Sequence, residues 1–154
     1  MPRINLVKAI VRYRPINPAR QFVRGRENIE NQTRYLLLQK ATDTYLQENV
    51  GKWECVGGMI KPKETSIEAI TREMTEETGL PNKSFKIVRQ LPTRTSNDSI
   101  CDVYLIDVSS TKIKLSEEHS EYQWFKAEEV KKQDLVKYAD LLLEFFNNPE
   151  KYFN

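Results

Sequence analysis

The sequence predicts a mixed β-sheet held between helices, an α/β (α+β) sandwich. Three observations favour this fold class: several short runs rich in β-branched residues, one helical segment in mid-chain with start and stop signals, and an amphipathic segment near the C-terminus. The chain has 154 residues and shows no internal repeat and no long linker. We therefore expect a single domain over residues 1–154.

The first half of the chain contains three predicted strands. Residues Ile4–Tyr13 alternate and are rich in β-branched side chains, Tyr35–Gln39 are apolar enough for burial on both faces, and Trp53–Val56 form a short run that ends at two glycines. The polar residues 16–33 are long for a loop, which indicates a functional or a partly mobile segment. Three arginines in it could reach an anionic substrate, although a solvated loop is the simpler interpretation: Arg20, Arg24 and Arg26.

A helix is predicted between Thr65 and Gly79. Thr65 and Glu68 have the spacing of a capping box, in which each side chain satisfies a backbone N–H of the first turn. Gly79 supplies a left-handed stop and Pro81 follows it at the expected distance. Three apolar positions recur at i, i+3 and i+7 and predict one buried face: Ile67, Ile70 and Met74.

The second half of the chain contains more strands and a final helix. Phe85–Leu91, Ile100–Val108 and the shorter Tyr122–Phe125 are predicted strands. Ala127–Lys132 indicate a helical turn, and Leu135–Phe146 keep one face apolar at helical spacing. A sheet with a central and a terminal helix therefore accounts for the whole pattern.

Composition excludes several classes of protein. A net charge of +2 lacks the basic surplus of a nucleic-acid-binding surface, so nucleic acid is an improbable partner. No apolar run approaches the roughly 18 residues of a membrane span, and the N-terminus does not resemble a signal peptide. Cys55 and Cys101 lie in apolar surroundings, as expected for buried free thiols, and we expect a cytoplasmic location.

Three glutamates break two local rules within the central helix. Glu73, Glu76 and Glu77 share one face beside the apolar stripe, where like charges repel, and the last two lie in the final turn, where the helix dipole disfavours negative charge. A divalent cation with a preference for oxygen ligands, such as Mg²⁺, Mn²⁺ or Ca²⁺, would resolve both conflicts. Arg72 is within reach of Glu68 and Glu76 and could orient a carboxylate. On the helix alone, a solvated acidic face is the alternative.

The residues from Gly58 to Leu80 resemble the signature of the Nudix (MutT-like) hydrolase superfamily. That signature is a glycine, five residues, a glutamate, seven residues, and then Arg-Glu, two residues, Glu-Glu, one residue and glycine. Every fixed position matches, from Gly58 and Glu64 to the run that begins at Arg72 and ends at Leu80. The strand that precedes the signature and the Glu118-His119 pair that follows it are also similar to the family. The resemblance implies a Nudix-type α/β/α sandwich with a catalytic loop–helix–loop.

The resemblance also implies roles for individual residues. Glu73 and Glu77 would be the principal metal ligands, and Glu76 a further ligand or a base. The Gly57 carbonyl would join them, while Glu64 would support the loop or bind metal weakly and Arg72 would hold the glutamates by hydrogen bonds. The cofactor would be Mg²⁺, with Mn²⁺ as an alternative.

Outside the helix, the resemblance gives further expectations. Glu118 is the preferred general base, with Glu117 and Glu121 as alternatives. Lys40 and Gly58 would face the substrate phosphates. His119, the only histidine, is expected to have a structural hydrogen-bonding role.

The family cleaves a nucleoside diphosphate linked to another group, and the signature leaves that group open. Members that act on ADP-ribose carry a proline after the signature, at the position where this chain has Ser96. Members that act on dinucleoside polyphosphates carry a tyrosine at a similar distance, which this chain lacks. These absences are evidence against those two groups. The Glu118-His119 pair with Tyr122 and Trp124, and the compact length, are more similar to members that cleave a triphosphate, which implies a small (deoxy)nucleoside or pterin triphosphate, such as dihydroneopterin triphosphate, with release of pyrophosphate. An ADP-ribose, nucleotide-sugar or dinucleoside-polyphosphate hydrolase is the alternative, as are an enzyme of capped or triphosphorylated RNA ends and a non-hydrolysing sensor module. Because many relatives are dimers, a homodimer remains open.

Overall fold

The structure is a computed structural model that describes residues 2–15, 32–42 and 46–154. The arginines of the predicted long loop lie outside the described residues. The strands are β1 (Ile4–Tyr13), β2 (Arg34–Lys40), β3 (Trp53–Glu54), β4 (Val56–Met59), β5 (Phe85–Thr95), β6 (Ser99–Val108) and β7 (His119–Phe125). The helices are α2 (Ser66–Thr78), α3 (Ala127–Val130), α4 (Asp140–Asn147) and α5 (Pro149–Tyr152), with short 3-10 turns η1 (Gln47–Asn49), η2 (Asn82–Ser84) and η3 (Lys137–Ala139).

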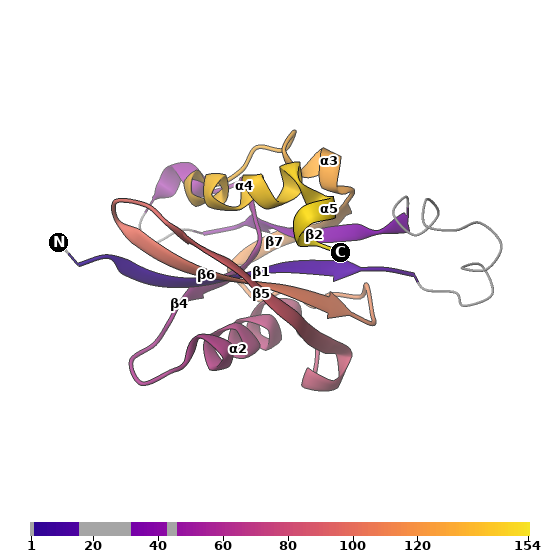
Figure 1. The fold of residues 1–154 in the computed structure, drawn as a ribbon, viewed down its shortest axis with the longest axis horizontal. Coiled ribbons are helices and arrows are strands. Elements are labelled where there is room, and N and C mark those ends of the chain that lie inside the picture. Colours follow the sequence, from indigo (N-terminus) through magenta and orange to yellow (C-terminus); the bar gives the residue numbers. More distant parts are fainter. Residues whose placement is uncertain (1, 16–31, 43–45) are drawn as a thin grey trace.

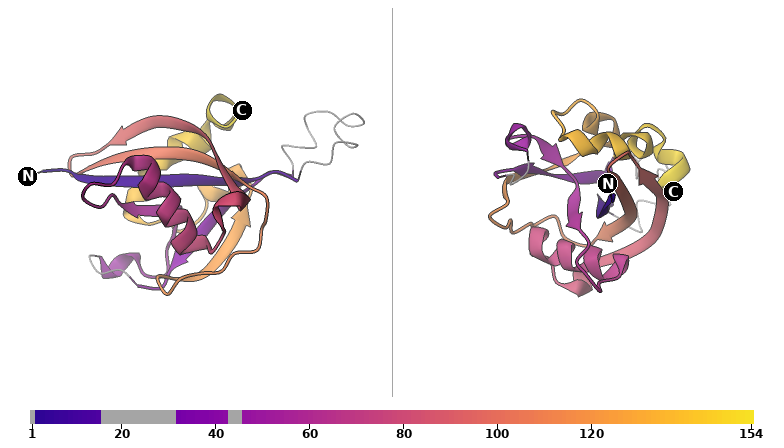
Figure 2. Two further views of the ribbon diagram at one scale, coloured as in Figure 1. Left: turned by 90° about the horizontal axis from the view of Figure 1, so that it is seen from below. Right: turned by 90° about the vertical axis from the view of Figure 1, so that its left-hand side faces the viewer.

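The described strands form one mixed sheet between two helical layers. The strand order is β3-β2-β1-β6-β5, with β4 also paired to β1 and β7 also paired to β2. Helix α2 lies on one face of the sheet, and α3, α4 and α5 lie on the other (Figure 1). The end-on view in Figure 2 shows the same two layers on opposite sides of the curved sheet. The predicted α/β/α sandwich is therefore confirmed.

Two hydrophobic cores fill the spaces between the sheet and its helices. Along β1, Val7, Ala9 and Val11 face the core that contains α2, whereas Ile10 faces the core that contains α4. β2 and β6 alternate in the same way, because successive side chains of a strand point to opposite faces. Burial on both faces explains why these strands read as nearly continuous apolar runs.

Strand β1 lies at a fork in the sheet. It pairs in parallel with β6 along nearly its whole length, and on its other side it pairs with β4 through residues 6–9 and with β2 only at Arg12 and Tyr13. Arg12 forms an ion pair with Asp107 of β6, with 2.6 Å between Nε and Oδ1. Because β4 pairs with residues 6–9 of β1, the loop between β4 and α2 begins at Ile60, whose backbone N–H donates to the Asn5 carbonyl near the start of β1.

Helix α2 has the ends that the sequence predicts. The Thr65 side chain accepts from Glu68 N at 3.1 Å, and Glu68 Oε1 accepts from Thr65 N at 3.2 Å, which completes the capping box. Gly79 has φ +71°, in the left-handed region. One predicted core position is wrong, because the Ile67 side chain is 54% exposed, while Ile70 is fully buried. Ile67 lies in the first turn of the helix, which extends beyond the apolar core.

The predicted strand Trp53–Val56 is two strands. Trp53–Glu54 pair with β2, and Val56 to Met59 pair with β1, so the chain changes partner at Cys55. The two glycines therefore lie inside β4 and do not end a strand. Cys55 and Cys101 are both buried free thiols, as predicted.

The predicted helix Leu135–Phe146 begins later than its apolar pattern. Leu135 forms a parallel bridge with Trp53, and η3 and then α4 follow. The apolar period is still meaningful, because Leu142, Phe145 and Phe146 enter the core, and α5 adds Tyr152. In the described part of the chain, no helix has the length and apolar character needed to cross a membrane.

Candidate active site

Glu77 is a carboxylate held inside the molecule at the end of α2. Its side chain is 3% exposed, and Oε1 accepts a hydrogen bond of 2.7 Å from the backbone N–H of Gly57. Burial raises the pKa of this carboxyl well above its ordinary value, and the neighbouring Glu73 adds to the rise, although the Lys8 ammonium opposes it. A cation bound here would replace the proton that this environment favours.

Glu73 packs against the backbone of the preceding loop. A Cβ atom at Gly58 would lie 2.6 Å from Glu73 Oε1, so a larger residue there would displace this carboxylate from its position. Burial also raises the pKa of Glu73, while its contact with Arg72 lowers it. Gly57 is constrained more strongly, because it has φ +144° and a Cβ would lie 2.1 Å from the Val7 carbonyl oxygen. The glycine pair thus allows the loop to approach both carboxylates.

Arg72 joins the loop to the helix. Its guanidinium donates two hydrogen bonds to Glu64, at 2.8 and 2.9 Å, and contacts Glu73 at 3.0 Å and Glu76 at 3.3 Å. The Arg72 hydrogen bonds lower the pKa of Glu64 to about 2. The expected contact to Glu68 is absent among the contacts of the described residues, because Glu68 is engaged in the capping box. Glu76 is the outermost of the three helix glutamates, with a side chain 53% exposed.

A second group of charged side chains lies near the segment that joins β4 to α2. These side chains come from β1, β2 and β3. Glu54 is buried and contacts Lys8 Nζ at 3.0 Å and Lys40 Nζ at 3.4 Å. His119 Nε2 lies 2.8 Å from Glu54 Oε2. Burial alone would raise the pKa of Glu54, but Lys8, the His119 hydrogen bond and Lys40 outweigh it and hold this pKa well below its usual range. Glu54 is therefore a buried carboxylate that stays ionised.

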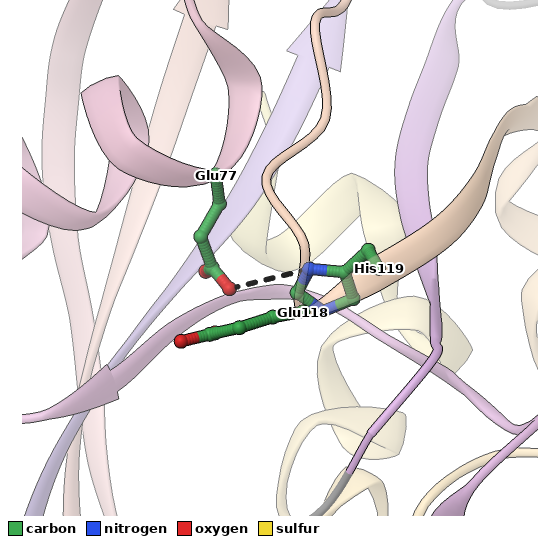
Figure 3. A group of neighbouring side chains, drawn as sticks. All are labelled: Glu77, Glu118 and His119. Atoms are coloured by element: carbon green, nitrogen blue, oxygen red, sulfur yellow. Dashed lines mark ion pairs between the residues drawn. The ribbon is translucent and has the colours of Figure 1, made fainter.

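The Glu118 side chain lies close to Glu77 and His119. It is exposed, at the end of the loop before β7, and its carboxylate lies with Glu77 and His119 in a group whose ligand atoms are all within 4.8 Å of one another. Figure 3 shows the Glu118 side chain extending past the imidazole toward the side where the Glu77 carboxylate lies. Of the alternative bases, Glu117 lines a neighbouring surface pocket together with Glu77 and Glu118, whereas Glu121 lies along β7 opposite Gln39.

One pocket of about 520 Å³ connects these groups. Its charged part contains Glu73, Glu77 and Glu118 together with Lys8 and Lys40. Its apolar part is formed by the start of β1 and by the segment that leads into α4, with side chains that include Leu6, Val136, Tyr138 and Leu142. The volume falls within the range of about 300–1,000 Å³ that is typical of small-molecule sites. The arrangement can hold a cation and a charged ligand at one end and an apolar ring at the other.

The residues fit a divalent metal ion. Two buried carboxylates with raised pKa values and an exposed third carboxylate converge on one pocket, and oxygen-rich sites of this kind suit hard divalent cations. The sequence located most of these residues, and the structure places Glu73, Glu77, Gly57, Gly58, Lys40 and Glu118 at the pocket. Glu64 and Glu76 lie beside the pocket, where each forms an ion pair with Arg72.

Sequence reasoning missed Lys8 and Glu54. The only signal for Lys8 is a lone positive charge inside an apolar strand, and Glu54 has the matching negative charge in an apolar strand 46 residues later. Two opposite charges in strands that are buried on both faces are a hint of a pair, because a buried charge needs a partner.

The family model described as NUDIX domain matches residues 27–145. The chain belongs to the Nudix family. Nudix relatives of this chain include the nucleoside triphosphatase NudI of Klebsiella pneumoniae and that of Escherichia coli, each 33% identical over 119 residues, which cover 70% of this chain and 83% of the relative. As a Nudix hydrolase, the protein acts on phosphoric anhydride bonds.

Solved Nudix structures share the fold over nearly the whole chain. The MutT protein of Methanosarcina mazei is 27% identical, with a TM-score of 0.64 and coverage of 97% of this chain and 96% of that one. The Ap4A hydrolase of Caenorhabditis elegans is 16% identical, with a TM-score of 0.66 and coverage of 95% and 96%. The comparison with the Ap4A hydrolase shows a common fold alone. The single domain over residues 1–154 stays a prediction.

Proposed function

We propose that this protein is a Mg²⁺-dependent pyrophosphohydrolase of small nucleoside triphosphates, which releases pyrophosphate. The observation that carries the proposal is the pocket that joins the carboxylates of α2 to lysines at one end and to an apolar cleft at the other. The name of the relative NudI, a nucleoside triphosphatase, supports the same substrate class. Dihydroneopterin triphosphate is a pterin and not a nucleoside, but it has the same triphosphate and a ring of similar character, so the proposal includes it.

The proposed roles follow from the position of each side chain. Glu73 and Glu77 hold the metal, with Glu76 and the Gly57 carbonyl as further ligands. The bound ion supplies charge neutralisation of the phosphates and an acidified water. Glu118, exposed over the pocket, takes a proton from the attacking water.

The remaining residues position these groups and the substrate. Arg72 fixes the loop through its double hydrogen bond to Glu64, which favours loop support over metal binding for Glu64. Gly58 keeps the loop close to Glu73, and Lys40 faces the phosphates from the end of β2.

The test is a substrate panel with the purified chain and Mg²⁺. Nucleoside triphosphates, dihydroneopterin triphosphate, ADP-ribose, a nucleotide sugar and a dinucleoside tetraphosphate are compared, with pyrophosphate and phosphate measured separately. We expect the highest kcat/KM for a triphosphate, with pyrophosphate as product. A preference for ADP-ribose or a dinucleoside polyphosphate would contradict the substrate class, and tight nucleotide binding without any product would favour a sensor module.

A further inference from the structure

His119 occupies a fully buried position beside the carboxylates. It is the first residue of β7, pairs with Lys40 at an irregularity in the β2–β7 ladder, and has a side chain that is 0% exposed. Its two ring nitrogens have different surroundings. Nε2 faces Glu54, and Nδ1 faces Glu77. A role limited to hydrogen bonding would account for the first contact but not for the second.

The contact with Glu54 fixes which nitrogen carries the proton. Glu54 stays ionised beside two lysines, and an ionised carboxylate can only accept hydrogen bonds. Nε2 therefore donates to Glu54 Oε2 across 2.8 Å. In a neutral imidazole the other nitrogen then carries a lone pair, so Nδ1 presents an acceptor to its surroundings.

Nδ1 has no hydrogen-bond partner. It is one of two buried side-chain nitrogens in this condition among the described residues. The nearest carboxyl oxygen is Oε2 of Glu77, at 3.5 Å, which the dashed line in Figure 3 marks. A lone pair that faces a carboxylate oxygen is unfavourable, and a buried polar atom without a partner costs free energy. A cation between the two atoms would satisfy both.

The geometry points to a site for a divalent transition-metal ion, formed by Nδ1 of His119 and by one carboxylate oxygen each of Glu77 and Glu118, which leaves the second Glu118 oxygen for the role of base. This inference deepens the proposed function, because it assigns a nitrogen ligand and a metal preference to part of the same site. The three ligand atoms lie within 4.8 Å of one another. Atoms bound to one ion at about 2.0–2.2 Å lie at most about 4.4 Å apart, so a small rotation of the exposed Glu118 side chain closes the site.

The choice of metal follows from the donor atoms. Mg²⁺ takes oxygen ligands, whereas imidazole nitrogen suits transition-metal ions such as Zn²⁺, Fe²⁺ and Ni²⁺. Mn²⁺ begins the same affinity series and combines a preference for oxygen with acceptance of nitrogen. Histidines that bind metals commonly donate their second N–H to a carboxylate, which orients the ring and increases its basicity, and Glu54 stands in that position. We therefore expect the site to bind Mn²⁺ more tightly than Mg²⁺.

The first test is a spectroscopic one that needs no substrate. The full chain is purified without a histidine tag, stripped of metal and given less than one equivalent of Mn²⁺. Electron spin-echo envelope modulation then measures the coupling of ¹⁴N nuclei to the bound ion. His119 is the only histidine in the chain, so an imidazole coupling has a single source. We expect this coupling in the wild type, and its absence would overturn the inference.

The second test separates metal binding from a structural role. In His119→Gln, the amide nitrogen can still donate to Glu54, but the Nδ1 ligand is lost. We expect this variant to lose the ¹⁴N coupling and at least about 10-fold of the ratio of Mn²⁺ to Mg²⁺ affinity, measured by calorimetry. The exposed Glu128→Gln serves as the control and should keep both properties. A folded His119→Gln with an unchanged ratio would overturn the inference, and if this variant does not fold, the wild-type spectrum decides alone.

Failure of this inference is distinguishable from failure of the proposed function. Neither measurement contains a nucleotide. Nitrogen coupling without hydrolysis of any triphosphate would keep the metal site and contradict the proposed function. Hydrolysis with Mg²⁺ but no nitrogen coupling would do the reverse.

Discussion

Glu77 shows how an unfavourable residue can mark a function. A carboxylate with a pKa raised by burial costs stability at neutral pH, because its charged form is disfavoured inside the protein. A metal-free protein would therefore be no less stable with a neutral amide at this position, and the Gly57 N–H could still donate to it. We propose that the charge at Glu77 serves the binding of a metal ion.

The first prediction concerns Glu77→Gln. We expect kcat to fall at least about 100-fold, which exceeds the effect of losing an outer-shell partner of a metal, while the melting temperature of the metal-free protein stays equal or rises. Steady-state kinetics and thermal unfolding in a chelator measure the two quantities. Glu128→Gln is the matched control. Retained turnover, or a large loss of metal-free stability, would contradict the role given to this residue.

The buried thiols give a second prediction, on pH. Burial raises the pKa of Cys55 to about 12 and that of Cys101 to about 11. Because these folded-state values lie above the ordinary thiol value, their contribution to stability is complete below about pH 8.5 and is lost as the pH rises toward 11–12. Native protein at pH 8 should react slowly with a thiol reagent, and the unfolded chain quickly. Fast labelling of native protein would show that the thiols are accessible.

The elements of the chain differ in how far sequence alone predicts them. Helix α2 could be bounded to the residue, because Thr65, Glu68 and Gly79 act locally and need no other part of the fold. The division at Cys55 could not be predicted, because it depends on which strand lies beside each residue. The structure at Leu135 could not be predicted for the same reason. Its apolar spacing is helical, but its bridge with Trp53 overrides that local preference.

The third prediction tests the local origin of α2. Thr65→Ala removes the cap and should lower the free energy of unfolding by about 1 kcal/mol. Thr71→Ala deletes the same group inside the same helix, where Thr71 bonds only to the Ile67 carbonyl, and should be neutral or slightly stabilising because alanine has the better helix propensity. Denaturant titration measures both. Equal losses from the two changes would show that the cap contributes nothing specific.

At the scale of the molecule, the site is assembled from segments that lie far apart in the sequence. The signature supplied α2 and its loop, because those residues are close in sequence and carry charges that conflict locally. Lys8, Glu54 and the orientation of His119 could not be predicted, since Lys8 and Glu54 are 46 residues apart and Glu54 and His119 are 65 residues apart. Their proximity exists only after β1, β3 and β7 have taken their places in the sheet.

The fourth prediction follows from that assembly. A divalent ion bound to the folded site alone should stabilise the whole protein, by about 2.7 kcal/mol at 100 times its dissociation constant, which corresponds to a rise of about 5–10 °C in melting temperature. Glu73→Gln should reduce this rise, and Glu128→Gln should not. Chelator should reverse it. An equal melting temperature with and without the ion would contradict a metal site in the native state.

The fork at β1 also has a consequence for the newly made chain. The parallel partner of β1 over most of its length is β6, and Arg12 lies 95 residues before its ion-pair partner Asp107. At the usual pace of synthesis of about 5–20 residues per second, this interval lasts about 5–20 s. During that time an apolar strand emerges from the ribosome with only short antiparallel partners on one side. Slower synthesis therefore lengthens the period in which this strand can pair with another chain, so soluble yield depends on translation speed as well as on the stability of the finished protein.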